Sequence, residues 1–352
     1  MCAGLDPTNS HQNLLHAPNV HVGGGLVLLQ QLLAVRNFPF AWVQLDVRIQ
    51  GILQIPSGVS AVFVRPSLLS RVLAEFRLWR VTRSGDRVLC FHGLPPLFPL
   101  PGRVTVFLQN RLLVEPGSLA SYSLRLRLRL GLERFWSRVL QGRVARYIVQ
   151  TSSMAAAVRR WLRRDITVSV FPFSSLAHPE GETLPLPAAE RRFDFVYVSS
   201  GEPHKNHRNL LDAWRLLKEA GHRPSLALTL DNQADFELTE YTRQFTARFD
   251  LDVVNLGLLS RDQMPGLYRS ARAMIFPSTT ESLGLPLIEA AHYRLPILAP
   301  ELDYVRDVVE PVETFDPASP TSIARAVRRF LGTAEIPEAI GSGEAFLAEV
   351  CR

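Results

Sequence analysis

Short apolar runs alternate with amphipathic segments through the second half of the chain. The runs predict strands, and the segments between them, where apolar positions recur every three or four residues, predict helices. Strands and helices in alternation are typical of a parallel, doubly wound α/β sheet. The predicted strands are Phe193–Ser199, Leu226–Leu230, Val253–Leu256, Ala273–Phe276 and Pro296–Ala299, and the main predicted helices are Arg208–Ala220, Asp262–Ser270, Pro286–Tyr293 and Thr321–Leu331.

The pattern of the first half is less regular. Leu14–Leu15 begins an apolar run that His16 and Pro18 interrupt, and a triple glycine then precedes a helical pattern at Leu26–Val35. Further apolar runs predict buried strands, so we expect a second α/β sheet here. These predicted strands are Asp86–Phe91, Arg103–Leu108 and Tyr147–Gln150.

A proline-containing stretch without periodicity separates the two halves at 176–191, which predicts a linker. We therefore expect an N-terminal Rossmann-like domain at 1–175 and a C-terminal one at 192–335. The tail at 336–352 is expected to pack back on the N-terminal domain. A length of 352 residues fits two such domains.

Composition narrows the class of protein. The chain is 47% hydrophobic and 20% charged, which is the balance of a globular protein. Its three cysteines, Cys2, Cys90 and Cys351, are scattered, which argues against a disulfide framework or a structural zinc site and favours a reducing compartment. We find neither a long uncharged apolar stretch nor a signal-peptide pattern, and we expect a cytoplasmic protein.

The basic residues are unevenly chosen and unevenly placed. Only Lys205 and Lys218 are lysines among the 39 basic residues. In a chain that otherwise uses arginine, each lysine is a candidate for a role that arginine does not fill. The net charge of +6 suits anionic partners. Nucleic acid is not among the partners we expect.

Residues 121–164 carry eleven arginines and one acid, Glu133. Helical spacing places an apolar stripe on one face of this segment and arginines roughly opposite. Two interpretations stay open: the helix packs on its own domain with a solvated basic face, or it lies on an anionic membrane surface. The stripe is Leu124, Leu128, Leu132, Phe135 and Val139, and the arginines are Arg127, Arg134 and Arg138.

The segment 277–290, PSTTESLGLPLIEA, carries the most specific chemistry. It joins a short apolar strand to a helix, with Glu281 in the turn and Glu289 eight residues later. Gly284 allows close approach to a ligand, and Pro286 suits the first turn of a helix. The free amides and positive dipole end of such a helix form a site for a diphosphate.

This segment resembles the Glu-x7-Glu motif of retaining glycosyltransferases with the two-domain GT-B fold, family four in particular. The stretches YVSSGEPHKNHRNLLDAW, LGLLSRDQMPGLYRSARAMIFPS and LPILAPELDYVRDVVEP are also similar to that family, and the first half is more loosely so, in HAPNVHVGGGLVLL and VTVFLQNRLLV. The resemblance implies two Rossmann-like domains facing each other across a cleft. It implies transfer of a sugar from a nucleotide-diphosphate donor to a glycan or lipid-linked acceptor, with retention of configuration and without metal or other cofactor. The implied setting is bacterial surface polysaccharide synthesis, lipopolysaccharide included, at the inner face of the membrane.

The resemblance also assigns residues. Lys205 and Glu281 would be catalytic, the lysine by neutralising the diphosphate and the glutamate by orienting the donor sugar. The other donor-binding residues would be Glu289, Gly284, Ser282, Leu285, Gly201 and Asn206. On the acceptor or cleft side we expect Gly23, Gly24, Gly25, His92 and Asn110.

The chain departs from the family at two sites that matter. Glu202 follows Gly201 where many members carry a cation, and Arg208 is a candidate replacement. Gln109-Asn110 stands where many relatives have a histidine facing the donor. No metal site is expected: His204 and His207 lack carboxylate or thiol company, and Asp250-Leu251-Asp252 matches a metal-binding Asp-x-Asp by chance.

Two rival functions stay open. One is a different enzyme on the same fold, either a nucleotide-sugar epimerase, which would consume donor without an acceptor, or a phosphorylase. The other is a non-catalytic, membrane-associated scaffold.

Overall fold

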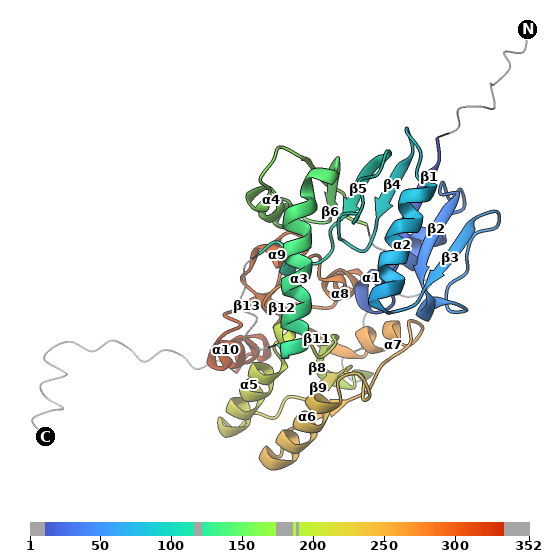
Figure 1. Cartoon of the computed structure of the whole chain (residues 1–352). Helices are drawn as coiled ribbons and strands as arrows, with labels where there is room; N and C mark the ends of the chain where they lie inside the picture. Colours follow the sequence, from blue (N-terminus) through green and yellow to red (C-terminus); the bar gives the residue numbers. More distant parts are fainter. Residues whose placement is uncertain (1–10, 116–121, 174–185, 188–189, 334–352) are drawn as a thin grey trace, which may run out of the picture.

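A computed structural model of the chain describes residues 11–115, 122–173, 186–187 and 190–333. These residues form two parallel-sheet α/β Rossmann-like domains (Figure 1). The expected tail at 336–352 and most of the expected linker at 176–191 lie outside the described residues.

The N-terminal sheet has seven parallel strands, and its first strand includes the residue that the sequence pattern treated as an interruption. β1 continues through His16, because the ring is buried against Gln44 (2.7 Å) and Glu75 (3.1 Å). The order across the sheet is β3 (Ser60–Val64), β2 (Trp42–Asp46), β1 (Asn13–Ala17), β4 (Arg87–Cys90), β5 (Arg103–Phe107), β6 (Arg146–Val149) and β7 (Thr167–Val170).

The helices of this domain cover both faces of the sheet, as in a doubly wound fold. α1 packs on one face through Leu28, Leu29 and Leu33, while Leu78 of α2 and Leu130 of α3 lie in the core on the other. The helices are α1 (Gly23–Leu33), α2 (Leu68–Val81), α3 (Leu124–Leu140) and α4 (Ser152–Trp161), with the short 3-10 turns η1 (Val47–Ile49), η2 (Arg111–Leu113) and η3 (Gln141–Arg143).

The C-terminal sheet matches the sequence pattern closely, and each predicted strand and helix is present within a few residues. Its parallel order is β10 (Val253–Asn255), β9 (Leu226–Leu228), β8 (Phe193–Tyr197), β11 (Ala271–Ile275), β12 (Ile297–Pro300) and β13 (Glu313–Phe315). The helical elements are η5 (Pro203–Lys205), α5 (His207–Glu219), α6 (Phe236–Phe249), α7 (Met264–Arg269), α8 (Leu285–His292), α9 (Asp303–Arg306) and α10 (Pro320–Leu331).

The strand order in each sheet reverses at one point, between β1 and β4 and between β8 and β11. In open α/β sheets, ligands bind outside the carboxyl ends of the strands at such a point. Both switch points open toward the boundary between the domains. A Cβ placed on Gly24, after β1, would lie only 3.1 Å from Leu285, after β11.

The arginine-rich segment forms the predicted helix, α3, but with a different face inward. The predicted apolar stripe, from Leu124 to Val139, is 58–70% exposed. Arg134 instead donates to the carbonyl oxygens of Leu112 (2.7 Å) and Glu115 (3.1 Å) within its own domain. The helix does pack on its own domain, but through Leu126 and Leu130. The prediction that the stripe from Leu124 to Val139 faces inward, with a solvated basic face opposite, is therefore wrong. Among the described residues, no helix is both long and apolar enough to span a bilayer.

Candidate functional site

Two loops of the C-terminal domain meet at the switch point of its sheet. The loop after β8 ends in η5 with Lys205, and the loop after β11 carries Glu281. Lys205 Nζ lies 2.6 Å from Glu281 Oε1, and the two side chains are 15% and 11% exposed. This position at the carboxyl ends of adjacent parallel strands brings together the two residues predicted to be catalytic.

The backbone around Lys205 is held on three sides. Tyr197 Oη donates to the Lys205 carbonyl (2.7 Å), and the amide of Thr279 donates to the His204 carbonyl (2.8 Å). Asn206 follows in the left-handed region (φ 64°), and its side-chain amide donates to the carbonyls of Pro277 and Pro317. The amide of Asn206, predicted to bind donor, thus ties three loops together.

The start of α8 requires a glycine. Gly284 precedes the helix in the left-handed conformation (φ 73°), and a Cβ there would lie 3.1 Å from Leu287 Cδ1. The free amide at the start of α8 is that of Leu285, because Pro286 has no N–H and the Leu287 amide donates to the Gly284 carbonyl (2.9 Å). The dipole of the helix adds positive potential at this end. The same loop that positions Glu281 therefore ends in an anion-binding geometry.

Glu289 lies one turn into α8, where its carboxylate accepts a hydrogen bond from Tyr268 Oη (2.7 Å). Burial raises the pKa of Glu289, although this hydrogen bond and the charge of Arg261 oppose the rise. Tyr268 in turn stacks on Tyr293. Glu289 is thus a largely desolvated acceptor, the property needed to hold a hydroxyl group.

Gly201 packs tightly, since a Cβ there would lie 2.6 Å from Asp235 Oδ1.

The Glu202 carboxyl has a pKa below its ordinary value. Burial alone would raise this pKa, but a hydrogen bond from Ser200 and the charge of Lys205 lower it by more. The candidate replacement cation is not at this site: the Arg208 guanidinium lies 4.0 Å from the centre of the Tyr241 ring of α6.

The triple glycine is the first turn of α1, which begins three residues earlier than predicted. Gly23 adopts φ 62°, and Gly24 lies against Leu285 of the other domain. A Cβ on Gly25 would be 3.4 Å from Gln109 Oε1. The amide-rich start of α1 therefore lies beside the start of α8.

His92 is not among the residues that line the two pockets between the domains. Its Nδ1 is 3.3 Å from the His16 carbonyl, and its ring meets the His16 ring edge-on at 4.8 Å. Burial lowers the pKa of His92 to about 3, so the ring is neutral at pH 7. His16, Glu75 and His92 each offer one atom that could bind a metal ion, and these three atoms lie within 4.8 Å of one another. Among the described residues, this is the group with the composition of a metal site.

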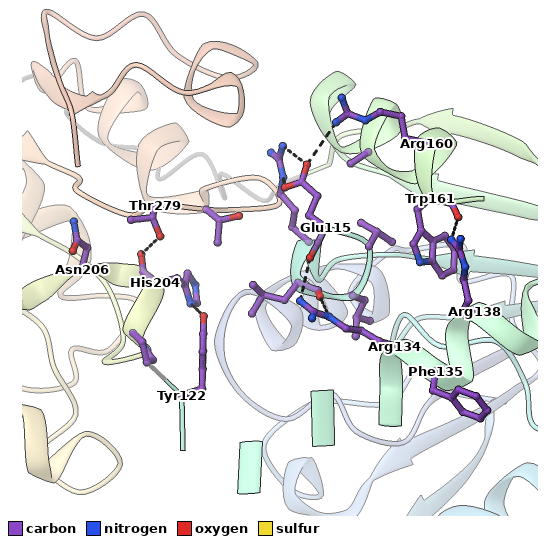
Figure 2. A pocket seen from close by; sticks show the side chains of 17 residues that line it. Glu115, Tyr122, Arg134, Phe135, Arg138, Arg160, Trp161, His204, Asn206 and Thr279 are labelled. Atoms are coloured by element: carbon purple, nitrogen blue, oxygen red, sulfur yellow. Dashed lines mark hydrogen bonds and ion pairs between the residues drawn. The ribbon is translucent and has the colours of Figure 1, made fainter. Parts of the chain in front are cut away.

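A pocket of about 1200 Å³ lies between the domains (Figure 2). Its C-terminal side includes His204, Asn206 and Thr279. Its N-terminal side is basic and includes Arg111, Arg134, Arg138 and Arg160, with Glu115 as the acid among its lining residues. Arg111 and Arg160 share the Glu115 carboxylate, at 2.7 Å and 3.8 Å.

A smaller pocket shares Arg111 and His204 with this basic space and reaches Glu281. Its lining includes Asn110 and Arg111 from the N-terminal domain and Glu281 and Ser282 from the C-terminal domain. Sequence reasoning missed Arg111, although its place just after β5, at the carboxyl end of a parallel strand, was a usable signal. Tyr122 also links the domains, with its Oη 3.0 Å from His204 Nδ1.

Comparison with known proteins agrees with this geometry. Residues 185–343 match the model of the family described as glycosyl transferases group 1. The C-terminal domain lies within this match. Its match includes both loops that form the Lys205–Glu281 pair.

Relatives in Escherichia coli extend the similarity toward the N-terminal domain. The chain is 26% identical over 218 residues to the serotype-specific mannosyltransferase WbdA, a match that covers 57% of this chain and 27% of the relative. It is 32% identical over 120 residues to O-antigen chain mannosyltransferase B, covering 32% of this chain and 30% of that one. The match thus spans less than a third of the length of either relative.

Solved structures that superpose on more than 90% of the chain confirm the GT-B fold. Sucrose-phosphate synthase from Thermosynechococcus elongatus superposes with a TM-score of 0.70 at 15% identity, covering 92% of this chain and 90% of that one. HepE from Anabaena, in complex with UDP-glucose, gives 0.68 at 15% identity, covering 91% and 90%. The prediction of two Rossmann-like domains in the GT-B arrangement is confirmed.

Proposed function

We propose that the chain is a glycosyltransferase that moves a sugar from a nucleotide-diphosphate donor to a glycan or lipid-linked acceptor with retention of anomeric configuration. The observation that carries the proposal is the Lys205–Glu281 pair, 2.6 Å apart, in the loops beside the N-terminus of α8. A cation and a helix start suit a diphosphate, while a carboxylate next to them suits sugar hydroxyls.

The donor diphosphate would lie at the start of α8 with the Lys205 ammonium on its oxygens. The bond between the anomeric carbon and the phosphate oxygen breaks, so negative charge grows on the departing diphosphate. A mobile ammonium and fixed amides stabilise that charge most where it develops. No step in this scheme needs a metal ion, and we propose that none is required.

Glu281 would accept hydrogen bonds from the hydroxyls of the donor sugar and so hold its anomeric carbon within reach of the acceptor hydroxyl. Glu289, deeper in α8, would accept from the hydroxyls of the nucleotide ribose. For retention, the acceptor hydroxyl attacks from the face that the diphosphate leaves, and its proton passes to the departing phosphate oxygen. A new carbon–oxygen bond replaces the broken one, and charge balances.

The acceptor would enter from the basic pocket that leads to Glu281. Four arginines and one glutamate in its lining favour an acceptor that carries phosphate. The relatives are named for mannosyl transfer in O-antigen chains, which supports surface polysaccharide synthesis as the setting. The cytoplasmic side of a bacterial inner membrane would supply both substrates.

Incubating the purified chain with nucleotide-sugar donors and membrane-derived lipid-linked glycans tests this function. We expect a glycosylated product whose anomeric proton coupling in NMR matches the configuration of the donor sugar. An inverted anomer would overturn retention alone. Consumption of the donor without any acceptor would identify an epimerase instead, and an absence of any reaction or nucleotide binding would favour a scaffold.

A further inference from the structure

Two helices of the N-terminal domain present long rows of apolar side chains to solvent. The α3 row recurs every three or four residues and so forms one stripe along the helix. Scattered exposed apolar residues are ordinary, but a continuous patch of this length marks an interaction surface. The α3 row is Leu124, Leu128, Leu132, Phe135 and Val139, and the α2 row, 37–88% exposed, is Leu68, Leu69, Val72, Leu73, Phe76, Trp79 and Val81.

The helices that carry the two rows are neighbours, because residues 95–98 contact both of them. The Phe98 ring lies 6.2 Å from Phe76 and 6.5 Å from Trp79 of α2. From α3, Trp136 Nε1 donates to the Pro95 carbonyl (2.9 Å). In Figure 1, α2 lies in front of the N-terminal sheet, and α3 runs from that sheet toward α5 and α10 of the C-terminal domain. Both helices contribute to the same core cluster. We call this surface, formed by α2, residues 95–98 and α3, the α2–α3 face.

The α2–α3 face is also strongly basic. Its two helices carry eight arginines, and five of these are exposed: Arg77, Arg80, Arg125, Arg127 and Arg129. Arg134 and Arg138 instead donate to backbone carbonyls within the domain. Glu75 is buried against His16, and Glu133 pairs with Arg129 (2.9 Å), so the negative charge is already engaged. Apolar rows flanked by arginines match a surface that offers both apolar depth and negative charge.

We propose that the α2–α3 face docks on an anionic lipid bilayer, with both helices lying in the interface. Leucine and phenylalanine side chains would enter the boundary between headgroups and acyl chains, while arginines would contact lipid phosphates. A second copy of the chain fits this face poorly, because a symmetric dimer would bring two arginine-rich surfaces together.

Docking in this way would place the basic pocket at the membrane. Arg134, Phe135 and Arg138 of α3 line that pocket, and Phe135 also belongs to the apolar row. If the proposed function holds, a lipid-linked acceptor would reach the pocket without leaving the bilayer. The docking itself does not depend on that activity.

Vesicle flotation of the full chain tests the docking. We compare phosphatidylcholine vesicles with vesicles that contain about 30% phosphatidylglycerol, since anionic lipid adds attraction for each exposed arginine. The variants are L128E/L132E on α3 and L68E/L69E on α2, which avoid the pocket lining. The matched control is Phe236→Glu on α6, 66% exposed in the other domain.

We expect the wild type to float with the anionic vesicles, and less so at high salt. Each double variant should lower the partition coefficient at least about tenfold, because two leucines no longer enter the bilayer. Phe236→Glu should float like the wild type. Brominated lipids should quench tryptophan emission, and Trp79→Phe should remove part of that quenching.

Three outcomes would overturn the proposal: no flotation of the wild type with anionic vesicles, unchanged flotation of both double variants, or a wild-type dimer that L128E/L132E converts to monomer. Thermal unfolding checks that the variants remain folded. Nucleotide binding by the variants is measured in parallel and should be unchanged, so a failure of docking is distinguished from a failure of the proposed function.

Discussion

Replacing Lys205 with alanine removes the ammonium that we place on the donor diphosphate. A charge-assisted hydrogen bond contributes about 1.5–3 kcal/mol, which corresponds to a roughly 10- to 150-fold loss of affinity. The structure favours the upper part of this range for two reasons. Lys205 and Glu281 are only 15% and 11% exposed, so water screens them weakly, and the variant leaves the Glu281 carboxylate facing the diphosphate without a counter-charge.

The double variant K205A/E281Q tests the contribution of the uncompensated Glu281 carboxylate. It removes the repulsion between this carboxylate and the diphosphate as well as the attraction between Lys205 and the diphosphate. We expect the double variant to bind nucleoside diphosphate more tightly than Lys205→Ala, though still less tightly than the wild type. Isothermal titration calorimetry with the nucleoside diphosphate that the wild type prefers measures all three affinities.

The chain offers a matched control in Lys218, its other lysine. Lys218 Nζ lies 2.9 Å from Asp250, which is 72% exposed, and such surface pairs contribute about 0–1 kcal/mol. Lys218→Ala should bind nucleotide like the wild type. The diphosphate site is wrongly placed if Lys205→Ala binds within a factor of two of the wild type, or if Lys218→Ala loses as much affinity as Lys205→Ala.

Three further predictions follow from the same site. Glu281→Gln should lower kcat at least about tenfold and nucleotide affinity much less, and an unchanged kcat would remove Glu281 from the mechanism. Gly284→Ala (φ 73°, with Leu287 3.1 Å away) should destabilise the fold by more than Gly332→Ala (φ 71°, nothing within 4 Å) in urea unfolding; equal losses would refute the packing argument. Burial and the Lys205 charge lower the pKa of His207 to about 3. At pH values between about 3 and the ordinary histidine pKa of 6.5, the unfolded chain therefore binds more protons than the folded chain. The free energy of unfolding should therefore fall as pH decreases through that window, less steeply in His207→Phe, and identical slopes would show that His207 is not responsible.

The C-terminal domain was predictable because local pattern and tertiary role agree there. Each strand of its parallel sheet is a short apolar run. In the segment around Glu281, the apolar strand, the glycine turn and the helix that follows all indicate the same local structure. The family resemblance placed Lys205 and Glu281 at one donor site, and the structure brings them together because their loops follow the adjacent strands β8 and β11. What their side chains touch, such as Tyr268 for Glu289, depends on packing that spacing does not encode.

The N-terminal domain shows where the pattern misleads. His16 is polar, but partners from β2 and α2 satisfy its ring, so the strand continues through it. In α3 the helical period was right, and the inward face was not. The helix carries a second apolar row that includes Leu126 and Leu130, and Arg134 satisfies backbone carbonyls inside the domain. The period of apolar residues identifies the faces of a helix, whereas the residues that pack against the helix decide which face is buried.

The most direct test of the account is a thermal unfolding screen of the wild type against UDP, GDP, CDP, TDP and ADP. A ligand at a hundred times its dissociation constant adds about 2.7 kcal/mol, or several degrees for a protein of this size. We predict that one of these nucleotides raises the unfolding temperature of the wild type and does not raise that of Lys205→Ala. An unchanged unfolding temperature with all five nucleotides at about millimolar concentration would contradict the proposal that this chain uses a nucleotide-diphosphate donor.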